Sequence, residues 1–583
     1  MNVAQRCTRK TRLIADLLAL LCLPYPVWPQ SFQGVLTGQF NVQRTGANLA
    51  ETILAPSNVS AGTFGLLFTQ TVDAAIYAQP LYLPGLTVNN AVHNVVFVAT
   101  MNDSVYAFDA DTAQPPLWHT SLGSPILIGT AMGILSTPVI DTNSKMIFVV
   151  TLSGPSATQS FVLHALNLLT GEETANINIQ GAVAGTGDNS QSTACTAWNG
   201  TTVAPPCIPF VPAEQLQRPA LLELTATATI LVGFGTRSGQ EAVNPYHGWL
   251  FGYQYSGGAF TQTMIFNSTL NSSQTGQPCS SQTPPTNLCG RGGGIWMSGR
   301  GPAADATGVY VVTGNGGYGG TETGNWGESA LRLNGAGVVE DSFTPSTYTS
   351  LNEADLDLGD AGAILFTSSN TTASQLLLAG GKTGKVYVLN RANLGGFTSG
   401  NLGAVQTFTA TSAACGTGPG QSGCYEIHSM AYWPRTNTTP IFYIWAWGDS
   451  LRVWDFNAST NQFRLDANQG KVTSPNYPGG GLAISANGNA NGILWAIIPA
   501  AVVSSGQTGV LYAFNATNVS TPLWMSTDYW FATKFTIPTI ANGKVYVPTA
   551  ASPSSVTPAY APQLRVYGLC TNCPQERANG GRE

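Results

Sequence analysis

Charged side chains are scarce in this chain. Lys, Arg, Asp and Glu together make up 9% of its 583 residues, against about a quarter in ordinary soluble proteins. This scarcity excludes charge-rich disorder, coiled coils and long solvated helices, all of which depend on charged faces. The net charge of −6 also leaves no basic stripe that would neutralise phosphates, so nucleic acid is not an expected partner.

Long apolar runs are absent as well, since no stretch reaches the ~18 residues that a membrane-spanning helix needs. A short apolar stretch at 17–23 follows four basic residues within positions 6–12, which is the layout of a secretory signal. We therefore expect a secreted or periplasmic protein without a membrane span. Its expected parts are a signal peptide and leader at 1–34, a single domain at 35–569 and a C-terminal tail at 570–583.

Beyond the leader, the chain has eight cysteines that fall into close pairs. Closing a loop of ~10 residues with a disulfide stabilises a protein by roughly 2 to 3 kcal/mol, and an exported protein meets an oxidising compartment. Metal binding by the thiolates is the weaker alternative, because no His lies at zinc-finger spacing. The expected disulfides are Cys195 with Cys207, Cys279 with Cys289, Cys415 with Cys424, and Cys570 with Cys573.

Short runs of β-branched and aromatic residues alternate with turn residues from about 64 to 569, which predicts an all-β chain. The clearest unit, at 75–123, contains four strands, and similar units cover 132–181, 217–269, 294–346, 355–410, 426–470 and 476–529. A period of about 50 residues with four strands per unit is typical of a β-propeller. The last unit, 530–569, lacks a fourth strand, and an orphan strand lies at 64–72. We expect the orphan strand to complete the last of eight blades, with seven blades as the alternative if 355–410 is misread.

Two segments carry a family resemblance. YAFDADT with the following LW (Tyr106–Trp118) and HALNLLTGEE (His164–Glu173) resemble the repeats of quinoprotein (PQQ) dehydrogenase propellers, and the chain looks nearest to secreted bacterial members named by fold. The resemblance implies an eight-bladed quinoprotein alcohol dehydrogenase-like fold and leaves PQQ and calcium open as cofactors. Active members clamp the cofactor between a Trp and two adjacent cysteines, and this sequence has no Cys-Cys dipeptide. Their metal ligands and catalytic Asp cannot be placed on this chain residue by residue.

Propeller topology brings the first residues of the innermost strands together at the central axis. Arg218 and Arg300 would there grip a carboxylate, and Asp360 and His428 would form an acid/base pair. The alternative is that these residues only pair with one another and line a water-filled channel. The expected axial ring consists of Gln79, Ser136, Arg218, Arg300, Asp360, His428 and Lys534.

Three further features are candidate sites. Asp355 and Asp357, in an acidic cluster, offer hard oxygen ligands for calcium, although a solvated acidic loop explains the cluster too. His247 lies at the start of a strand on the face with the long loops, where it would border the funnel or serve as a satisfied structural residue. Trp326, in one of the long loops, is a candidate platform for stacking a sugar ring.

Two functions are compatible with these features, and the sequence leaves open whether the protein is an enzyme. The first is an extracellular binding or scaffold protein, expected to be a monomer, whose long-loop face recognises a polymer such as a polysaccharide by carbohydrate binding. The alternative is a PQQ- and calcium-dependent oxidoreductase that acts on a small alcohol or sugar in the central funnel.

Overall fold

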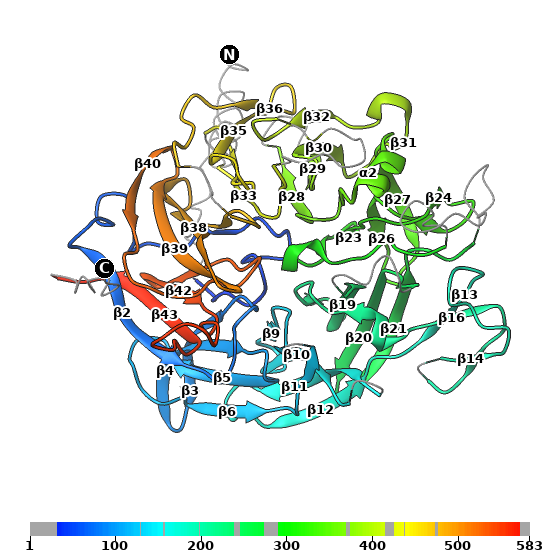
Figure 1. The fold of residues 1–583 in the computed structure, drawn as a ribbon, viewed down its shortest axis with the longest axis horizontal. Coiled ribbons are helices and arrows are strands. Elements are labelled where there is room, and N and C mark those ends of the chain that lie inside the picture. Colours follow the sequence, from blue (N-terminus) through cyan, green and yellow to red (C-terminus); the bar gives the residue numbers. More distant parts are fainter. Residues whose placement is uncertain are drawn as a thin grey trace, which may run out of the picture. The chain divides into compact units, whose positions relative to one another are not determined.

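Eight β-sheets surround a common axis and form a β-propeller (Figure 1). The computed structural model describes residues 32–571, except 129, 156–157, 198, 238–244, 273–289, 369–373, 414, 416–424, 436–437 and 473–475. The eight blades follow the predicted units in order, including the one at 355–410. The prediction of an eight-bladed all-β propeller is therefore confirmed, and the seven-bladed alternative is wrong.

Most blades are antiparallel four-stranded sheets whose first strand is innermost. Blade 1 consists of β3 (Leu81–Val88), β4 (Ala91–Ala99), β5 (Ser104–Asp109) and β6 (Trp118–Ser121). Blade 2 consists of β9 (Val139–Asp141), β10 (Met146–Ser153), β11 (Ser160–Asn167) and β12 (Glu173–Asn178). Blade 5 consists of β28 (Ala363–Thr367), β29 (Gln375–Gly380), β30 (Lys385–Asn390) and β32 (Gln406–Thr409). Blade 6 consists of β33 (Met430–Trp433), β34 (Ile441–Ile444), β35 (Arg452–Asn457) and β36 (Gln462–Leu465).

Three blades carry an additional short strand. Blade 3 consists of β17 (Gln215–Leu216), β18 (Leu222–Leu224), β19 (Thr229–Thr236), β20 (Trp249–Ser256) and β21 (Ala259–Asn267). Blade 4 consists of β22 (Ala303–Asp305), β23 (Gly308–Val312), β26 (Ala330–Leu333), β27 (Val339–Thr344) and β31 (Gly396–Phe397). Blade 7 consists of β1 (Ala47–Asn48), β37 (Gly481–Asn487), β38 (Ala490–Val503), β39 (Gly506–Asn515) and β40 (Asn518–Met525).

Blade 8 joins the two ends of the propeller sequence. Its strands are β41 (Thr539–Ala541), β42 (Lys544–Pro548), β43 (Gln563–Leu569) and β2 (Phe64–Thr71), and β2 pairs antiparallel with β43 from Phe64 opposite Leu569 to Thr71 opposite Gln563. In Figure 1 the blue β2 lies beside the red β43. The predicted ring closure is confirmed, and it covers an edge of β43 that would otherwise stay unpaired.

The loops carry short ribbons and a few short helical turns. The ribbons are β7 (Ile126–Ile128) with β8 (Thr130–Met132), β13 (Ala182–Ala184) with β16 (Cys207–Pro209), β14 (Cys195–Thr196) with β15 (Thr202–Val203), and β24 (Tyr318–Gly320) with β25 (Asn325–Trp326). The helices are η1 (Pro212–Glu214), η2 (Met297–Gly299), α2 (Tyr348–Ala354) and η3 (Ser399–Asn401). None of the helices within the described ranges is long and apolar enough to cross a membrane.

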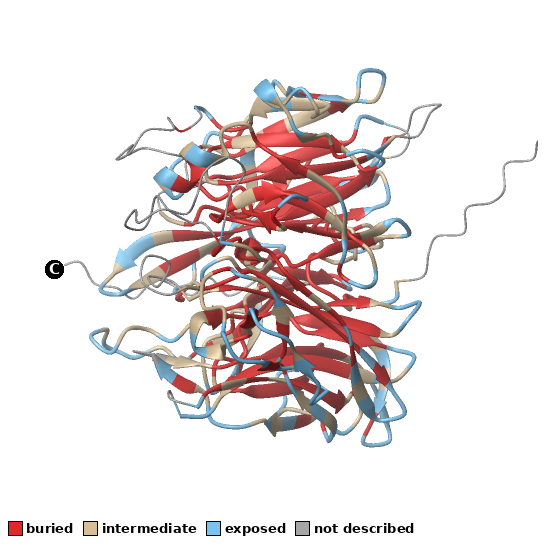
Figure 2. Cartoon of the chain, turned by 90° about the vertical axis from the view of Figure 1, so that its right-hand side faces the viewer, coloured by how far each residue is buried: buried red, intermediate tan, exposed pale blue. Residues whose placement is uncertain are grey.

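Packing between blades explains the repeated Trp and Gly of the sequence motif. Buried apolar residues run through every blade, whereas exposed residues gather at the turns (Figure 2). Trp118 of blade 1 donates from Nε1 to the carbonyl oxygen of Leu168 in blade 2, at 3.0 Å. Gly171 in the same turn has a φ of +71°, and a Cβ there would lie 2.4 Å from the Trp118 ring. The packing of the Trp118 indole thus needs a residue at 171 that adopts the left-handed turn and has no side chain, which is glycine.

Residues 35–48, here called the axial segment, contact the innermost strand of each blade in turn. Main-chain hydrogen bonds of 2.7 to 3.0 Å join the axial segment to six blades, namely 1, 2, 4, 5, 6 and 7. The strand residues in these bonds are, in blade order, Tyr82, Ile140, Ala304, Leu365, Tyr432 and Ile484. Side chains reach the other two blades, because Thr37 donates to Leu221 of blade 3 and Asn48 donates to Ile540 of blade 8. The axial segment therefore satisfies inner-edge groups that the sheets leave unpaired.

Arg44 holds the axial segment together and is fully buried. Its guanidinium donates to the carbonyl oxygens of Pro302 (2.7 Å), Gly38 (2.7 Å) and Leu221 (3.0 Å) and to the hydroxyl of Thr37 (2.8 Å). Burial, and secondarily the positive charge of Arg300, lower the pKa of Arg44 to about 9. Four hydrogen bonds thus offset the cost of burying a charge that forms no ion pair within the described part of the chain.

Cysteine pairing is observed where the structure describes it. Cys195 and Cys207 form the predicted disulfide, which connects β14 with β16. Cys415 and Cys570 are also disulfide-bonded. Their predicted partners Cys424 and Cys573 lie outside the described residues, as do the predicted pair Cys279 and Cys289 and the predicted signal peptide.

Candidate functional site

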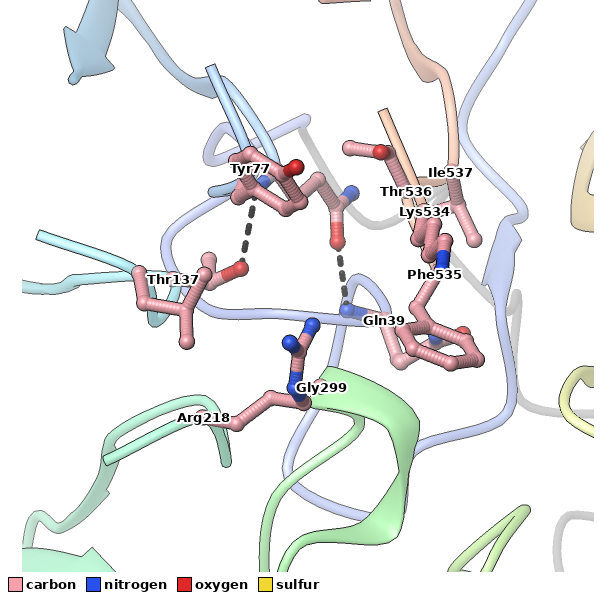
Figure 3. Close-up of a pocket in the computed structure, with 11 residues that line it drawn as sticks. Gln39, Tyr77, Thr137, Arg218, Gly299, Lys534, Phe535, Thr536 and Ile537 are labelled. Atoms are coloured by element: carbon pink, nitrogen blue, oxygen red, sulfur yellow. Dashed lines mark hydrogen bonds between the residues drawn. The ribbon is translucent and has the colours of Figure 1, made fainter. Parts of the chain in front are cut away.

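A hollow lined by cations but no acids lies at the axis. Its volume is about 360 Å³, including space open to solvent. In Figure 3, Arg218, which lies between β17 and β18, points into this hollow from one side, and Lys534 and Phe535, which precede β41, approach from the opposite side. The hollow, here called the cation hollow, is lined by Gln39, Tyr77, Gln79, Leu135, Thr137, Arg218, Gly299, Lys534, Phe535, Thr536 and Ile537.

Arg218 and Lys534 are the two charged groups of the cation hollow. Neither side chain forms an ion pair with another described residue, and both rest on aromatic rings, with Arg218 Cζ 5.0 Å from the centre of Phe535 and Lys534 Nζ 5.1 Å from that of Tyr477. Burial and the neighbouring charge of Arg218 lower the pKa of Lys534. The two cations therefore repel each other across a space that a bound anion would neutralise.

Gln79 anchors the floor of the cation hollow. Its Oε1 accepts from the main-chain N–H of Gln39 at 2.8 Å, and its own N–H donates to Thr137 at 2.9 Å (dashed lines at Gln39 and Thr137 in Figure 3). Its Nε2 donates to Thr539 at 3.2 Å. The structure thus places the predicted ligand-binding Gln79 in the lining. All of its polar side-chain atoms are engaged in holding the axial segment against blades 1, 2 and 8.

An acid/base group adjoins the cation hollow. His428, which lies just before β33, is flanked by two carboxylates: Asp360 Oδ2 lies 2.6 Å from Nδ1, and Glu426 Oε2 lies 3.1 Å from Nε2. Ser298 of η2 donates to the other oxygen of Asp360 at 2.5 Å. Exposure of the side chains rises from 0% for Asp360 through 2% for His428 to 17% for Glu426. We call these three residues the acid trio, and the predicted pairing of Asp360 with His428 is observed within it.

The acid trio favours a protonated His428. Burial by itself lowers the pKa of His428, but the charge of Asp360 and hydrogen bonds to Asp360 and Glu426 outweigh burial and raise the pKa above its ordinary value. The folded state therefore holds this proton more tightly than the unfolded chain does. The proton stabilises the folded state below about pH 6.5, and this contribution is lost as the pH rises through the raised pKa of His428.

The buried histidines should titrate in opposite directions. We expect His428 to titrate above pH 6.5, whereas burial lowers the pKa of His247 to about 4 and also lowers that of His164. NMR of the imidazole nitrogens across a pH series, assigned with single His→Gln variants, measures all three. The interpretation fails if His428 titrates at or below the value of an exposed histidine, because Asp360 and Glu426 would then not hold its proton.

Phe535 separates the cation hollow from the acid trio. Its ring centre lies 5.0 Å from Arg218 Cζ and 5.2 Å from the His428 ring, so the two charged groups lie no more than about 10 Å apart. A second hollow, lined by His428, shares Phe535 and Thr536 with the cation hollow. Phe535 has a φ of +64°, a conformation that is costly for a bulky side chain. The two hollows thus adjoin at Phe535 and are here together called the axial funnel; Arg218 and Lys534 line the first hollow, and His428 lines the second.

Arg300 does not point into the funnel. Its guanidinium donates to the main-chain carbonyl oxygens of Ala361 (2.8 Å), Met430 (2.5 Å) and Arg44, and burial lowers its pKa to about 9. The position at the start of an innermost strand was expected to turn this side chain toward a ligand. The axial segment offers carbonyl acceptors instead, so Lys534 rather than Arg300 stands opposite Arg218.

Two other predicted binding residues lie away from the funnel. His247 is buried, with Nδ1 2.8 Å from the hydroxyl of Thr269 and Nε2 2.8 Å from the carbonyl oxygen of Asp188. Trp326 is 5% exposed and packs in the hydrophobic core shared by blades 3 and 4. Neither side chain lines the cation hollow or the second hollow.

The predicted calcium ligands are paired with a lysine. Lys382 Nζ lies 2.6 Å from Asp357 Oδ2 and 3.2 Å from Asp355 Oδ1, and Asn315 donates to both carboxylates. The chain itself thus supplies a cation to these acids. The described residues that do bring three potential metal ligands together are Asp360, Glu426 and His428, with one ligand atom of each within 4.8 Å of the others.

Several residues that contact His428 or Asp360 were not identified from the sequence. Glu426 precedes His428 by two positions, so the Glu-x-His pattern before an innermost strand was an available signal. Ser298 lies in a short helix with left-handed backbone, and Tyr477 contacts His428 at 4.7 Å between ring centres from a loop before blade 7. Loop conformation places both side chains, and strand periodicity carries no information about it.

Solved structures share this fold at low sequence identity. A quinohemoprotein alcohol dehydrogenase from Pseudomonas putida HK5 is 12% identical, with a TM-score of 0.59 over 94% of this chain and 82% of that one. The quinohemoprotein alcohol dehydrogenase from Comamonas testosteroni is 13% identical, with a TM-score of 0.58 over 93% and 81%. The chain has the propeller fold of these enzymes. A europium-containing methanol dehydrogenase is 12% identical, with a TM-score of 0.55 over 95% of this chain and all of that one. No family model and no curated protein matches the sequence.

The funnel does not fit PQQ with calcium. A flat cofactor needs two parallel walls, but Tyr477 meets His428 at 82° and Phe535 at 85°, so these rings cross the funnel. Calcium takes six to eight oxygen ligands, whereas the carboxylates of Asp360 and Glu426 are both engaged by His428. The adjacent cysteines of the family clamp are also missing. We therefore derive no chemistry through this cofactor.

Proposed function

We propose that the protein is a binding propeller whose axial funnel holds a small organic anion by its carboxylate group. The observation that carries this proposal is the lining of the cation hollow, in which Arg218 and Lys534 face each other without an acidic partner among the described residues. In a chain with only 23 Lys and Arg residues, two such cations at one position are a costly arrangement unless an anion relieves their repulsion.

We propose different roles for the two cations. Arg218 lies deep in the funnel and presents a planar guanidinium, which suits two parallel hydrogen bonds to a carboxylate. Lys534 is exposed and acts as a point charge at the entrance. Tyr77 and Thr137 border the same space and offer hydroxyl groups. The funnel rather than the tips of the long loops carries the proposed binding function.

Arg218→Met should lower the affinity for carboxylates by roughly 10- to 100-fold, because a hydrogen bond to a charged group contributes about 1.5 to 3 kcal/mol. Lys534→Met should cost less, roughly 3- to 10-fold, because its charge is screened by solvent. Isothermal titration calorimetry with sodium hexanoate at low and high salt measures both effects, and added salt should weaken binding.

Lys471→Met is the matched control, since Lys471 is exposed and does not line the funnel. We expect this control to bind hexanoate as the wild type does. Equal affinity of Arg218→Met and wild type would refute the proposal, as would wild-type binding that is unaffected by salt.

A further inference from the structure

We infer that Lys382 is a built-in cation, whose ammonium group fills an oxygen-lined site of the kind that binds calcium and closes this site to metal ions. This inference is independent of the proposed carboxylate binding. It follows from the oxygen atoms that contact Lys382, from the support of those atoms and from the carboxylates that one ammonium group does not balance. We call the site formed by Asp355, Asp357 and Lys382 the lysine cage.

Oxygen atoms satisfy the ammonium group of Lys382. Its Nζ lies 2.6 Å from Asp357 Oδ2 and 3.2 Å from Asp355 Oδ1, and it donates to the main-chain carbonyl oxygen of Asp355 at 3.2 Å. The three protons of an ammonium group thus have three acceptors. Carboxylate and carbonyl oxygens are also the ligands that calcium prefers, at about 2.3 to 2.6 Å. The ammonium group therefore lies where these oxygen atoms would hold a metal ion.

The carboxylates of the lysine cage are supported without the lysine. Asp357 Oδ1 accepts from the main-chain N–H of Asn315 at 2.7 Å, and Asp355 Oδ1 accepts from Asn315 Nδ2 at 2.6 Å. Gly314 packs closely on the same carboxylate, since a Cβ there would lie 2.2 Å from Asp357 Oδ1. Lys382 comes from the turn between β29 and β30, whereas Asp355 and Asp357 lie between α2 and β28. Truncating the lysine should therefore leave the oxygen atoms in place.

Negative charge is in excess around the lysine cage. Glu328 is fully buried, and its Oε2 accepts at 2.6 Å from the main-chain N–H of Leu358, the residue after Asp357. Its Oε1 has no hydrogen bond among the described residues. Burial, followed by the charge of Asp357, raises the pKa of Glu328 well above its ordinary value. One ammonium group thus does not balance three carboxylates, which a divalent ion would neutralise further.

A further oxygen atom lies beside the lysine cage. Asn315 Oδ1 is buried without a hydrogen bond among the described residues, while Nδ2 of the same amide donates to Asp355. Rotating the amide by half a turn would bring Oδ1 next to Asp355 Oδ1. The side chain of Asp355 is 73% exposed, so water can complete the six to eight ligands of calcium. Without the lysine side chain, the cage thus offers oxygen ligands and access to solvent.

Lys382→Ala should convert the lysine cage into a calcium site. We expect this variant to bind calcium with a dissociation constant of about 10⁻⁴ M, roughly 10-fold or more tighter than the wild type. Titration calorimetry of the full-length proteins with calcium chloride, after treatment with a chelator, measures both affinities. Lys385→Ala, in the neighbouring strand β30, is the matched control and should bind calcium no better than the wild type.

Terbium locates the bound ion, because it substitutes for calcium and its emission is excited by a nearby indole. The ring centre of Trp296 lies 5.7 Å from Lys382 Nζ. Terbium emission excited through tryptophan should therefore appear in Lys382→Ala and be absent from the wild type. Adding Asp357→Asn to this variant should abolish both the emission and calcium binding. Adding Trp296→Phe instead should weaken the emission and leave calcium binding intact.

Melting curves complete the test. Calcium should raise the melting temperature of Lys382→Ala and leave that of the wild type unchanged. If the variant unfolds without calcium, refolding in calcium should restore a cooperative transition. The inference is overturned if folded Lys382→Ala binds calcium no better than the wild type, or if calcium fails to restore an unfolded variant. Wild-type calcium binding that Asp357→Asn abolishes would overturn it as well. None of these results bears on the proposed carboxylate site, so the two proposals fail separately.

Discussion

Replacing Arg44 with alanine should lower the free energy of unfolding by about 3 to 5 kcal/mol. The substitution leaves the carbonyl oxygens of Pro302 and Gly38 buried without their Arg44 donor, while Leu221 keeps only its hydrogen bond from Thr37. Each buried carbonyl left without a donor costs about 1 to 3 kcal/mol. The substitution also removes the cost of burying the Arg44 charge, but this gain offsets only part of the loss. Because the three carbonyls belong to the axial segment and to blades 3 and 4, the axial segment should detach from the inner strands.

Chemical denaturation followed by tryptophan fluorescence measures this loss. Arg464→Ala is the control, because its side chain is 73% exposed and an exposed ion pair contributes less than about 1 kcal/mol. Arg44→Lys should restore only part of the stability, since a single ammonium group cannot reach acceptors in several directions. A midpoint for Arg44→Ala equal to that of Arg464→Ala would show that the axial segment does not hold the blades.

Replacing Phe64 with alanine should destabilise the propeller by a similar amount, about 3 to 5 kcal/mol. Phe64 begins β2, the strand that closes the ring, and its ring lies 5.3 Å from Trp495 and 4.9 Å from Trp524 of blade 7. The side chain is 1% exposed, so the substitution leaves a cavity between blades 7 and 8. Weakening this contact favours opening of the ring at its closure.

Leu67→Ala provides the comparison on the same strand, because the Leu67 side chain is 37% exposed. This substitution should lower the free energy of unfolding by well under half as much as Phe64→Ala does. Hydrogen exchange of the β43 amides reports opening directly. We expect faster exchange in Phe64→Ala than in Leu67→Ala. Similar unfolding midpoints and exchange rates for the two variants would contradict the role of β2 as the closing strand.

The blades were predictable because sequence features within each unit determine its strands and turns. Each predicted unit contains strands with apolar alternation and turn residues, and the Trp118 and Gly171 motif marks the contact between neighbouring blades. Ring closure followed from counting strands, since Phe64–Thr71 had no partner and the last unit lacked one. The axial segment was not foreseen, because it forms almost no sheet and its contacts reach strands up to 492 positions away.

In the funnel, too, the positions of residues were predictable from the strands, whereas contacts with distant parts of the chain were not. Topology placed Gln79, Arg218, Asp360, His428 and Lys534 at the axis because each lies just before or near the start of an innermost strand. The direction of each side chain was not predictable, since it depends on neighbours that the axial segment and the loops supply. Arg300 occupies an equivalent position and yet binds main-chain carbonyls. Trp326 was assigned to a loop surface, but its ring fills the core beside it.

The most direct test of the carboxylate site is a crystal structure of the protein soaked in 6-bromohexanoate. The bromine gives an anomalous signal that locates the ligand without ambiguity. Our account predicts the carboxylate between Arg218 and Lys534 and the bromine peak beside the cation hollow. Bromine peaks found only elsewhere, with water alone between Arg218 and Lys534, would contradict it.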